Sequence, residues 1–273
     1  MTRGDPGLFG PGSAAWRINR EALVLAGGTA ALLMQLAHPA VAAGVEQHST
    51  FRTDPFGRLK RTLNLTYAWG FGSSRRADRA LRRIDAVHAA VRGRVPESGE
   101  PYAARDPELV LWVHATLVDA ALRVHDRYIA PLTREEAQAY HAELRVVAIR
   151  LGVPEERMPA TLDAMRTWMA AQLDEGRVWV TPTARALAPS VLWPARFPPR
   201  PVWTAAHMVS FSVLPPAIRA GYGIAWGAWH EAVMRGVAAY TRRVLPLMPP
   251  VLRHVPAARR AERRAARPPG QGS

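Results

Sequence analysis

The spacing of apolar side chains along this chain predicts helices over most of its length. Apolar residues recur every three or four positions, as on one face of a helix, whereas stretches that alternate between apolar and polar residues are scarce. Proline- and glycine-rich stretches at 95–105 and 189–201 separate these segments. The expected helices cover residues 20–37, 39–46, 55–71, 77–92, 107–128, 134–151, 159–175, 182–187, 203–213 and 224–244.

We therefore expect an all-α protein with a single helical domain. The domain is predicted at 17–250, preceded by a disordered N-terminal segment at 1–16 and followed by a basic disordered tail at 251–273. Two segments begin with an aspartate before a proline, Asp54-Pro55 and Asp106-Pro107, and Thr133 with Glu136 forms a capping box. Pro39 ends the first expected helix, because proline disfavours helical geometry at the residue before it.

The expected helix at 107–128 carries His114 in the middle of an apolar stretch. The positions three and four residues away on either side are leucine or valine: Val110, Leu111, Leu117 and Val118. The imidazole is therefore expected to point into the protein. A neutral imidazole in a dry pocket is a suitable axial ligand for a metal or for haem iron. A core histidine hydrogen-bonded to a carbonyl fits the same spacing.

The amino-acid composition excludes several kinds of functional site. The chain has 273 residues and no cysteine, which excludes disulfides, cysteine zinc sites, iron–sulfur clusters and a thiolate haem ligand. The net charge of +14 is typical of nucleic-acid-binding proteins. However, Lys60 is the only lysine, the arginines are spread along the chain, and no motif of interleaved aromatic and basic residues accompanies them. We expect no nucleic-acid partner, although a basic helical protein that binds DNA or RNA is the third alternative.

The chain shows no secretory signal, and its longest apolar run, 22–37, is shorter than the ~20 residues that span a bilayer. These features predict a cytoplasmic protein. The arginines of the tail leave peripheral contact with anionic lipid as a further expectation.

Two further groups of residues are candidates for chemistry. His38, Glu46 and His48 surround a small-residue turn at Pro39, where a flat cofactor can approach the backbone closely. A tight helix corner with Glu46 and His48 in solvent explains that pattern equally well. The second group is Arg58, Arg61 and Thr62, which share one helix face and suit carboxylates such as haem propionates. An exposed basic face is the alternative there.

Three blocks together resemble a known family. They are residues 27–49, which end in AHPAVAAGVEQHS, residues 54–62 (DPFGRLKRT) and residues 111–119 (LWVHATLVD). In this order they resemble the domain shared by latex-clearing rubber oxygenases and ER-bound MpaB-type oxygenases, over roughly residues 17–185. The resemblance implies a globin-like helical core that holds haem b, with His114 as the iron ligand.

The resemblance also implies roles for the other candidates. Arg58, Arg61 and Thr62 correspond to an Arg-x-x-Lys-Thr element on the distal side of the haem, where Arg58 also contacts the cofactor. Arg61 stands at the lysine position and, because arginine stays protonated, cannot bind iron as lysine does. Glu46 corresponds to a catalytic base, and His38 matches a His-Pro element near the haem pocket.

The expected function is that of a haem-dependent oxygenase that uses dioxygen on a hydrophobic small molecule. Arg58, Arg61, Thr62 and Glu46 are the expected catalytic residues, and His114, His38 and Arg58 the expected haem contacts. The alternative is a non-catalytic helical protein that binds haem or lipid.

Overall fold

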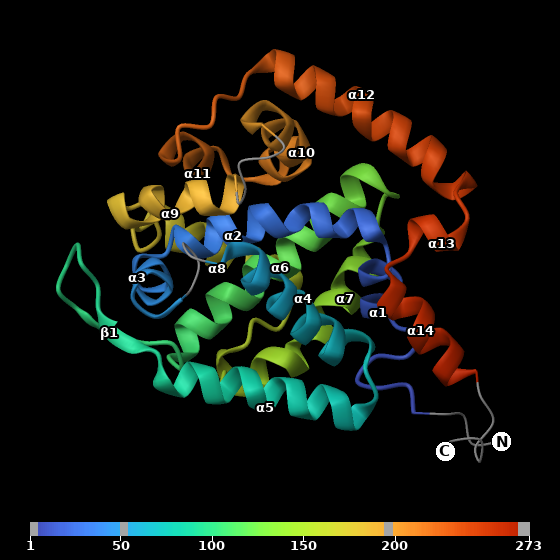
Figure 1. The fold of residues 1–273 in the computed structure, drawn as a ribbon, viewed down its shortest axis with the longest axis horizontal. Coiled ribbons are helices and arrows are strands. Elements are labelled where there is room, and N and C mark those ends of the chain that lie inside the picture. Colours follow the sequence, from blue (N-terminus) through green and yellow to red (C-terminus); the bar gives the residue numbers. More distant parts are fainter. Residues whose placement is uncertain (1–4, 50–53, 194–198, 267–273) are drawn as a thin grey trace.

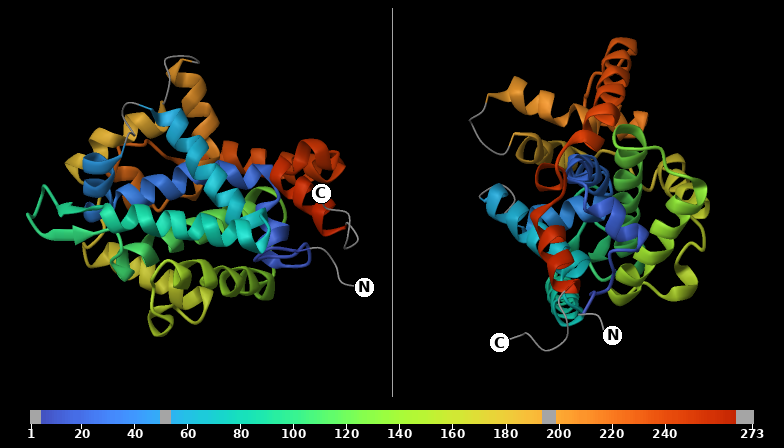
Figure 2. Two further views of the ribbon diagram at one scale, coloured as in Figure 1. Left: turned by 60° about the horizontal axis from the view of Figure 1, so that its bottom comes forward. Right: turned by 90° about the vertical axis from the view of Figure 1, so that its right-hand side faces the viewer.

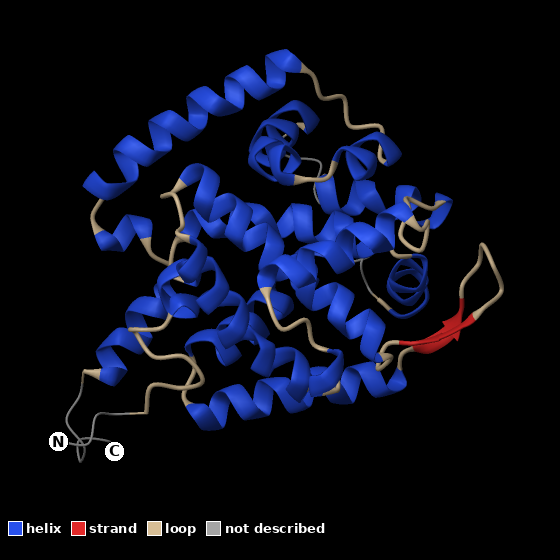
Figure 3. Ribbon diagram, turned by 180° about the vertical axis from the view of Figure 1, so that it is seen from behind, coloured by secondary structure: helices blue, strands red, loops and turns tan. Residues whose placement is uncertain are grey.

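The computed structural model describes residues 5–49, 54–193 and 199–266. The structure is 73% helical, and its described part contains fourteen α-helices and one short hairpin, so the all-α prediction is confirmed (Figures 1 and 3). The first elements are α1 (Ala14–Asn19), the 3-10 helix η1 (Ala22–Gly27), α2 (Gly28–Leu36), α3 (Pro39–His48), α4 (Pro55–Phe71), α5 (Ser74–Ala90), β1 (Arg92–Arg94) and β2 (Pro101–Ala103). They are followed by α6 (Pro107–Tyr128), α7 (Arg134–Arg150), η2 (Glu155–Arg157), α8 (Leu162–Asp174), α9 (Pro182–Leu192), α10 (Arg200–Val213), α11 (Pro216–Gly221), α12 (Ala228–Val244), η3 (Leu245–Leu247), α13 (Pro250–Arg253) and α14 (Pro256–Ala265).

Three helices begin at the predicted residues because their caps form as expected. Asp54 accepts a hydrogen bond from the backbone N–H of Gly57 at 2.8 Å, and Asp106 accepts one from Glu108 at 2.8 Å. At the start of α7, the Thr133 hydroxyl accepts from the N–H of Glu136 at 3.1 Å, and the Glu136 carboxylate accepts from the N–H of Thr133 at 3.0 Å.

The central element is α6, which runs through the middle of the molecule (Figure 1). It packs against η1, α2, α7, α8, α10 and α12, and fourteen of its 22 residues are buried. A helix that is buried on nearly all sides lies inside the core. The other elements therefore form a shell around α6.

The segment 20–37 differs from the single helix expected there. It follows the end of α1 and forms η1 and then α2. The Ser13 hydroxyl accepts from the N–H of Trp16 at 3.0 Å, which starts a helix earlier than expected. Glycines at 27 and 28 favour a break, because glycine is a poor helix former, and α2 begins there.

Gly27 allows η1 to approach α6 closely. A Cβ at this position would lie 3.1 Å from the carbonyl oxygen of Ala120 and 3.2 Å from Cγ2 of Val124, whereas a Cβ on Gly28 would meet nothing within 4 Å. We expect Gly27→Val to lower the free energy of unfolding by about 1–3 kcal/mol because it overpacks this contact. Gly28→Val is the matched control, and denaturant unfolding measures both. Equal losses in the two variants would contradict this account of the contact.

The chain ends also differ from expectation. Residues 251–273 were expected to be disordered, but α13 and α14 cover most of 250–265, and the described part of 1–16 includes buried Phe9 and the start of α1. Three side chains of α14 and its cap, Val255, Ala258 and Ala261, pack against Trp16 and Phe71. The arginines around these residues give the segment the composition of a solvated tail. Its narrow alanine face is nevertheless sufficient to pack the helix against the rest of the protein.

One smaller feature was not expected from the sequence. β1 and β2 form an antiparallel hairpin where a loop was expected, and it projects from one edge of the molecule (Figure 2). Within the described residues, no helix by itself has the length and apolar composition of a membrane span. Ala22–Leu36 and Pro39–His48 meet that description only as a pair, bent by 101°.

Candidate functional site

His114 lies on α6 inside the core, as the sequence predicted. Its side chain is 8% exposed, and its Nε2 atom is buried without a hydrogen-bond partner in the described structure. Burial, together with the electrostatic effect of His141, lowers the pKa of His114 to about 3. The imidazole is therefore neutral at pH 7, with one buried nitrogen that nothing satisfies.

The neighbours of His114 on α6 fix the direction in which it points. The indole N–H of Trp112 donates to the carbonyl of Met34 on α2 at 3.1 Å, and Gln35 of α2 donates to the Thr116 hydroxyl at 3.1 Å. Residues two apart on a helix lie about 200° apart around its axis. His114 therefore points away from α2, on the other side of α6.

His141 on α7 is the second buried histidine near His114. It is fully buried, and its Nε2 donates to the carbonyl of Pro159, since that carbonyl can only accept, over 3.0 Å. Its Nδ1 is then an unprotonated acceptor, and it has no partner in the described structure. Burial lowers the pKa of His141 as well. Two neutral imidazoles, each with an unsatisfied nitrogen, thus belong to the neighbouring helices α6 and α7.

An apolar side chain near His114 is uncovered. Leu117, one turn after His114 on α6, is 47% exposed. Large exposed apolar side chains on core elements are unusual, and when they group together they mark binding surfaces. This flank of α6 is suited to an apolar ligand.

His38 is a helix cap. Its Nδ1 accepts from the backbone N–H of Ala40 at 3.3 Å, which starts α3 and leaves the ring proton on Nε2 when the ring is neutral. Its ring centre lies 6.4 Å from that of Trp112, and burial lowers the pKa of His38 to about 4 against the opposing effect of Asp106. His38 therefore belongs to the side of α6 that carries Trp112, opposite to His114.

Glu46 lies on the exposed last turn of α3. The two residues after it hold the hairpin: Gln47 donates to the carbonyl of Arg94 at 2.9 Å, and His48 donates to the carbonyl of Arg92 at 3.0 Å. This end of α3 thus anchors the hairpin at the surface. The solvent-exposed helix corner, the alternative considered for this block, describes Glu46 and His48 better than a buried pocket does.

Arg61 and Thr62 are exposed on α4. Arg61 donates from Nη1 to Asp54 at 3.1 Å, so it supports the residue that caps its own helix. The helix packs mainly against α5, with further contacts to α1 and α14. Arg58 lies in the first turns of α4, but its side chain is outside the described part of the structure.

Residues 16–243 match the model of the family described as ER-bound oxygenase mpaB/B'/rubber oxygenase, catalytic domain. The chain belongs to this family. Its domain covers every helix from α2 to α12, so it includes α6 and both buried histidines.

Two curated relatives match this oxygenase-family chain. They are the uncharacterised proteins Rv2237 of Mycobacterium tuberculosis and Mb2261 of Mycobacterium bovis, each 31% identical over 149 residues, which is 52% of this chain. The chain spans 57% of the length of these relatives. No solved structure matches.

The candidate residues of this oxygenase-family domain fall into two groups. His114 is buried and unsatisfied, whereas Glu46, Arg61 and Thr62 are exposed, and no contact in the described structure brings them to His114. The described residues contain no cluster of three or more side chains that could hold a metal ion by themselves. A single buried imidazole fits haem on the protein side, because the porphyrin nitrogens would supply the further ligands that the iron needs.

Sequence reasoning missed two residues of this region. His141 carried a signal, since Leu144 lies three residues after it and Ala148 seven, the spacing of a buried helix face. Asp119 is 3% exposed and accepts from both Arg123 on α6 and Arg166 on α8, the latter at 3.0 Å. It ties α6 to α8, and no local pattern pairs a carboxylate with an arginine 47 residues away.

Proposed function

We propose that this chain is a haem-dependent oxygenase that acts with dioxygen on a hydrophobic small molecule. Membership of the oxygenase family supports the reaction class. The observation that supports haem is the Nε2 atom of His114, which is buried, uncharged at neutral pH and without a hydrogen-bond partner. Buried polar atoms are normally satisfied, so an unsatisfied imidazole nitrogen on a core helix favours a ligand.

The residues near His114 would have separate roles in holding haem. His114 would supply a nitrogen ligand to the haem iron and, because its pKa is far below 7, no proton competes for that nitrogen at neutral pH. Trp112 and Thr116 hold α6 against α2, which fixes the direction of the imidazole. Leu117 would offer apolar contact area to haem or substrate. Haem, when bound, supplies the iron that activates dioxygen. The globin-like arrangement is part of the same proposal.

The test is haem binding by the purified protein. We expect a Soret absorption band in the purified protein, or one that appears with saturation at one haemin per chain. His114→Ala is expected to abolish the saturable band. His88→Ala is the matched control, because His88 also has a buried, unpartnered nitrogen and a pKa lowered by burial, but lies on α5. Protein that takes up no haemin, or equal loss in both variants, contradicts the assignment.

A second function is favoured by a specific observation. Glu46 and Thr62 are exposed and Arg61 pairs with Asp54, so three of the four residues expected to act on oxygen lie at the surface. This arrangement favours a protein that binds haem or lipid without catalysis. An oxygen electrode separates the two functions: the oxygenase consumes dioxygen when a reactive apolar alkene is added to the haem-loaded protein, and the binding protein does not.

A further inference from the structure

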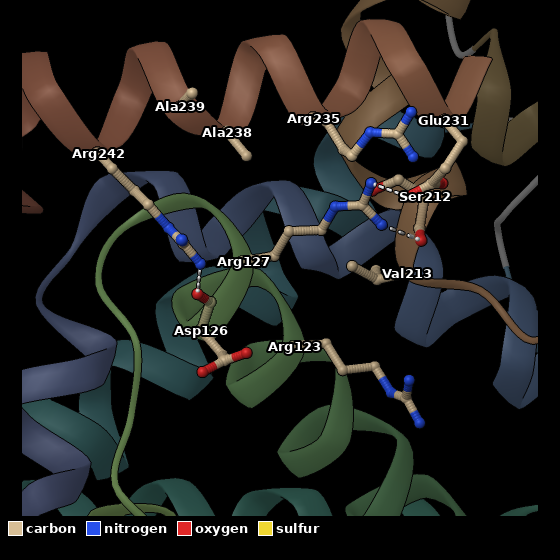
Figure 4. Close-up of a pocket in the computed structure, with 10 residues that line it drawn as sticks. All are labelled: Arg123, Asp126, Arg127, Ser212, Val213, Glu231, Arg235, Ala238, Ala239 and Arg242. Carbon is tan, nitrogen blue, oxygen red and sulfur yellow. Dashed lines mark hydrogen bonds and ion pairs between the residues drawn. The ribbon is translucent and has the colours of Figure 1, made fainter. Parts of the chain in front are cut away.

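A cavity lies well away from His114, between α6, the end of α10, and α12. Its volume is about 440 Å³, and its charged lining residues are Arg123, Arg127, Arg235, Arg242, Asp126 and Glu231 (Figure 4). Arg127 follows His114 by thirteen residues, which is about 20 Å along the helix axis. This cavity therefore belongs to a different region from the proposed haem site.

The lining carries more positive than negative charge. Four arginines and two acidic residues line this cavity, and Arg123 is ion-paired with Asp119, which lies outside the lining. Arg127 donates to the Glu231 carboxylate at 2.5 Å and to the carbonyl of Ser212 at 3.3 Å. Arg242 donates to the backbone carbonyl of Asp126 at 2.5 Å. A backbone carbonyl satisfies a hydrogen bond but cancels no charge, so the cavity keeps an excess of positive charge.

Part of this arrangement stabilises the fold. Arg127 lies in the last turn of α6 and reaches the last turn of α10, and both helix ends carry partial negative charge. That explanation does not extend to Arg235. Arg235 is exposed, and Figure 4 marks no hydrogen bond or ion pair from it to the other residues that line the cavity.

Two arginines of α12 lie on the helix face that lines the cavity. Arg235 and Arg242 are seven residues apart, which places them on the same face of the helix two turns apart. Arg243 follows directly in the sequence but points about 100° away and is not part of the lining. The positive charge inside the cavity is therefore specific to one face of α12.

We infer that this cavity binds an anionic small ligand that carries phosphate groups. Planar guanidinium groups pair with phosphate oxygens through two parallel hydrogen bonds, and arginine is enriched at sites that recognise phosphate for this reason. Arg235 and Arg242 approach from α12, and Arg127 from α6, so a diphosphate contacts both walls. The cavity volume of about 440 Å³ suits a small metabolite, since such pockets span roughly 300–1,000 Å³.

Isothermal titration calorimetry of the full-length protein with inorganic diphosphate tests this inference. We expect saturable binding of one diphosphate per chain that weakens as salt is raised. We expect Arg235→Gln to weaken binding; Arg235 has no marked bond in the cavity. We expect the double variant Arg235→Gln/Arg242→Gln to weaken binding by at least about tenfold. Arg243→Gln is the matched control and is expected to stay within about twofold of the unaltered protein.

A second arm separates a free phosphate ligand from a lipid headgroup. Sedimentation with phosphatidylcholine vesicles that contain phosphatidic acid is measured for the same variants. If the protein binds diphosphate but not the vesicles, the ligand is a free phosphate compound. If it binds the vesicles, and this binding is lost in Arg235→Gln/Arg242→Gln but kept in Arg243→Gln, the ligand is a lipid headgroup. Absence of saturable binding in both arms, or equal weakening by Arg243→Gln, overturns the inference. The double variant's unfolding midpoint is compared with that of the unaltered protein, and if it does not fold, Arg235→Gln alone decides.

Discussion

Replacing Trp112 with alanine is expected to lower the free energy of unfolding by about 3–5 kcal/mol. Trp112 is 1% exposed and is one of the largest fully buried side chains. Its indole N–H donates to the carbonyl of Met34 at 3.1 Å, and its ring lies 6.1 Å from that of Trp168, measured between centres. The substitution leaves a cavity between α6, α2 and α8 and leaves a buried carbonyl without its donor.

Trp179→Ala is the matched control for this prediction. Trp179 is 45% exposed, so its loss is expected to cost less than about 1 kcal/mol. Guanidinium unfolding followed by far-ultraviolet circular dichroism gives both values. Trp112→Phe is expected to lie between them, because it keeps most of the ring but not the hydrogen bond. Similar losses for Trp112→Ala and Trp179→Ala would show that α6 is not packed as described.

The haem-free protein is expected to lose stability through His114 as the pH falls below about 6.5. The pKa of His114 is about 3 in the folded protein, because burial disfavours the charged ring. Between these two values the unfolded chain takes up a proton at this histidine and the folded chain does not. Stability contributed by the neutral ring is therefore full above pH 6.5 and is lost progressively toward pH 3.

His114→Leu isolates this effect from that of other groups. Between pH 6 and pH 4 the unaltered protein is expected to lose about 2–3 kcal/mol more than the variant. His141 also has a pKa lowered by burial, and it is present in both proteins, so its contribution largely cancels. Urea unfolding at a series of pH values gives the comparison. Parallel pH profiles for the two proteins would mean that His114 is hydrated in the fold.

The sequence predicted those parts of the fold that depend on local chemistry. The starts of α4, α6 and α7 follow from Asp54, Asp106 and the capping box at Thr133, whose hydrogen bonds span two or three residues. The burial of His114 follows from the apolar positions around it on a single helix. Such features need no knowledge of what packs against the helix.

Other parts depend on contacts between distant segments. α14 is ordered because Ala258 and Ala261 meet Trp16 and Phe71, which lie some 190 to 245 residues earlier in the chain. The break in 20–37 reflects the contact of Gly27 with Ala120. A single sequence indicates the propensity of these segments, but not the surfaces that dock them.

The candidate site was predicted in part for the same reason. His114 was placed correctly inside the core, but the sequence did not reveal His141 opposite it on α7 or Asp119 between two arginines. His38 caps α3, and Glu46 lies on an exposed turn at the other end of that helix. The roles of Arg58, Arg61, Thr62 and Glu46 in catalysis stay predictions.

The most direct test of the central claim is chemical rescue of His114→Gly with imidazole. The claim is that the His114 ring provides the nitrogen ligand of haem iron. The variant is expected to show no saturable Soret band with haemin, and added imidazole, which fits the vacated space, is expected to restore that band with saturation. A variant whose haem spectrum matches that of the unaltered protein before imidazole is added would contradict the claim.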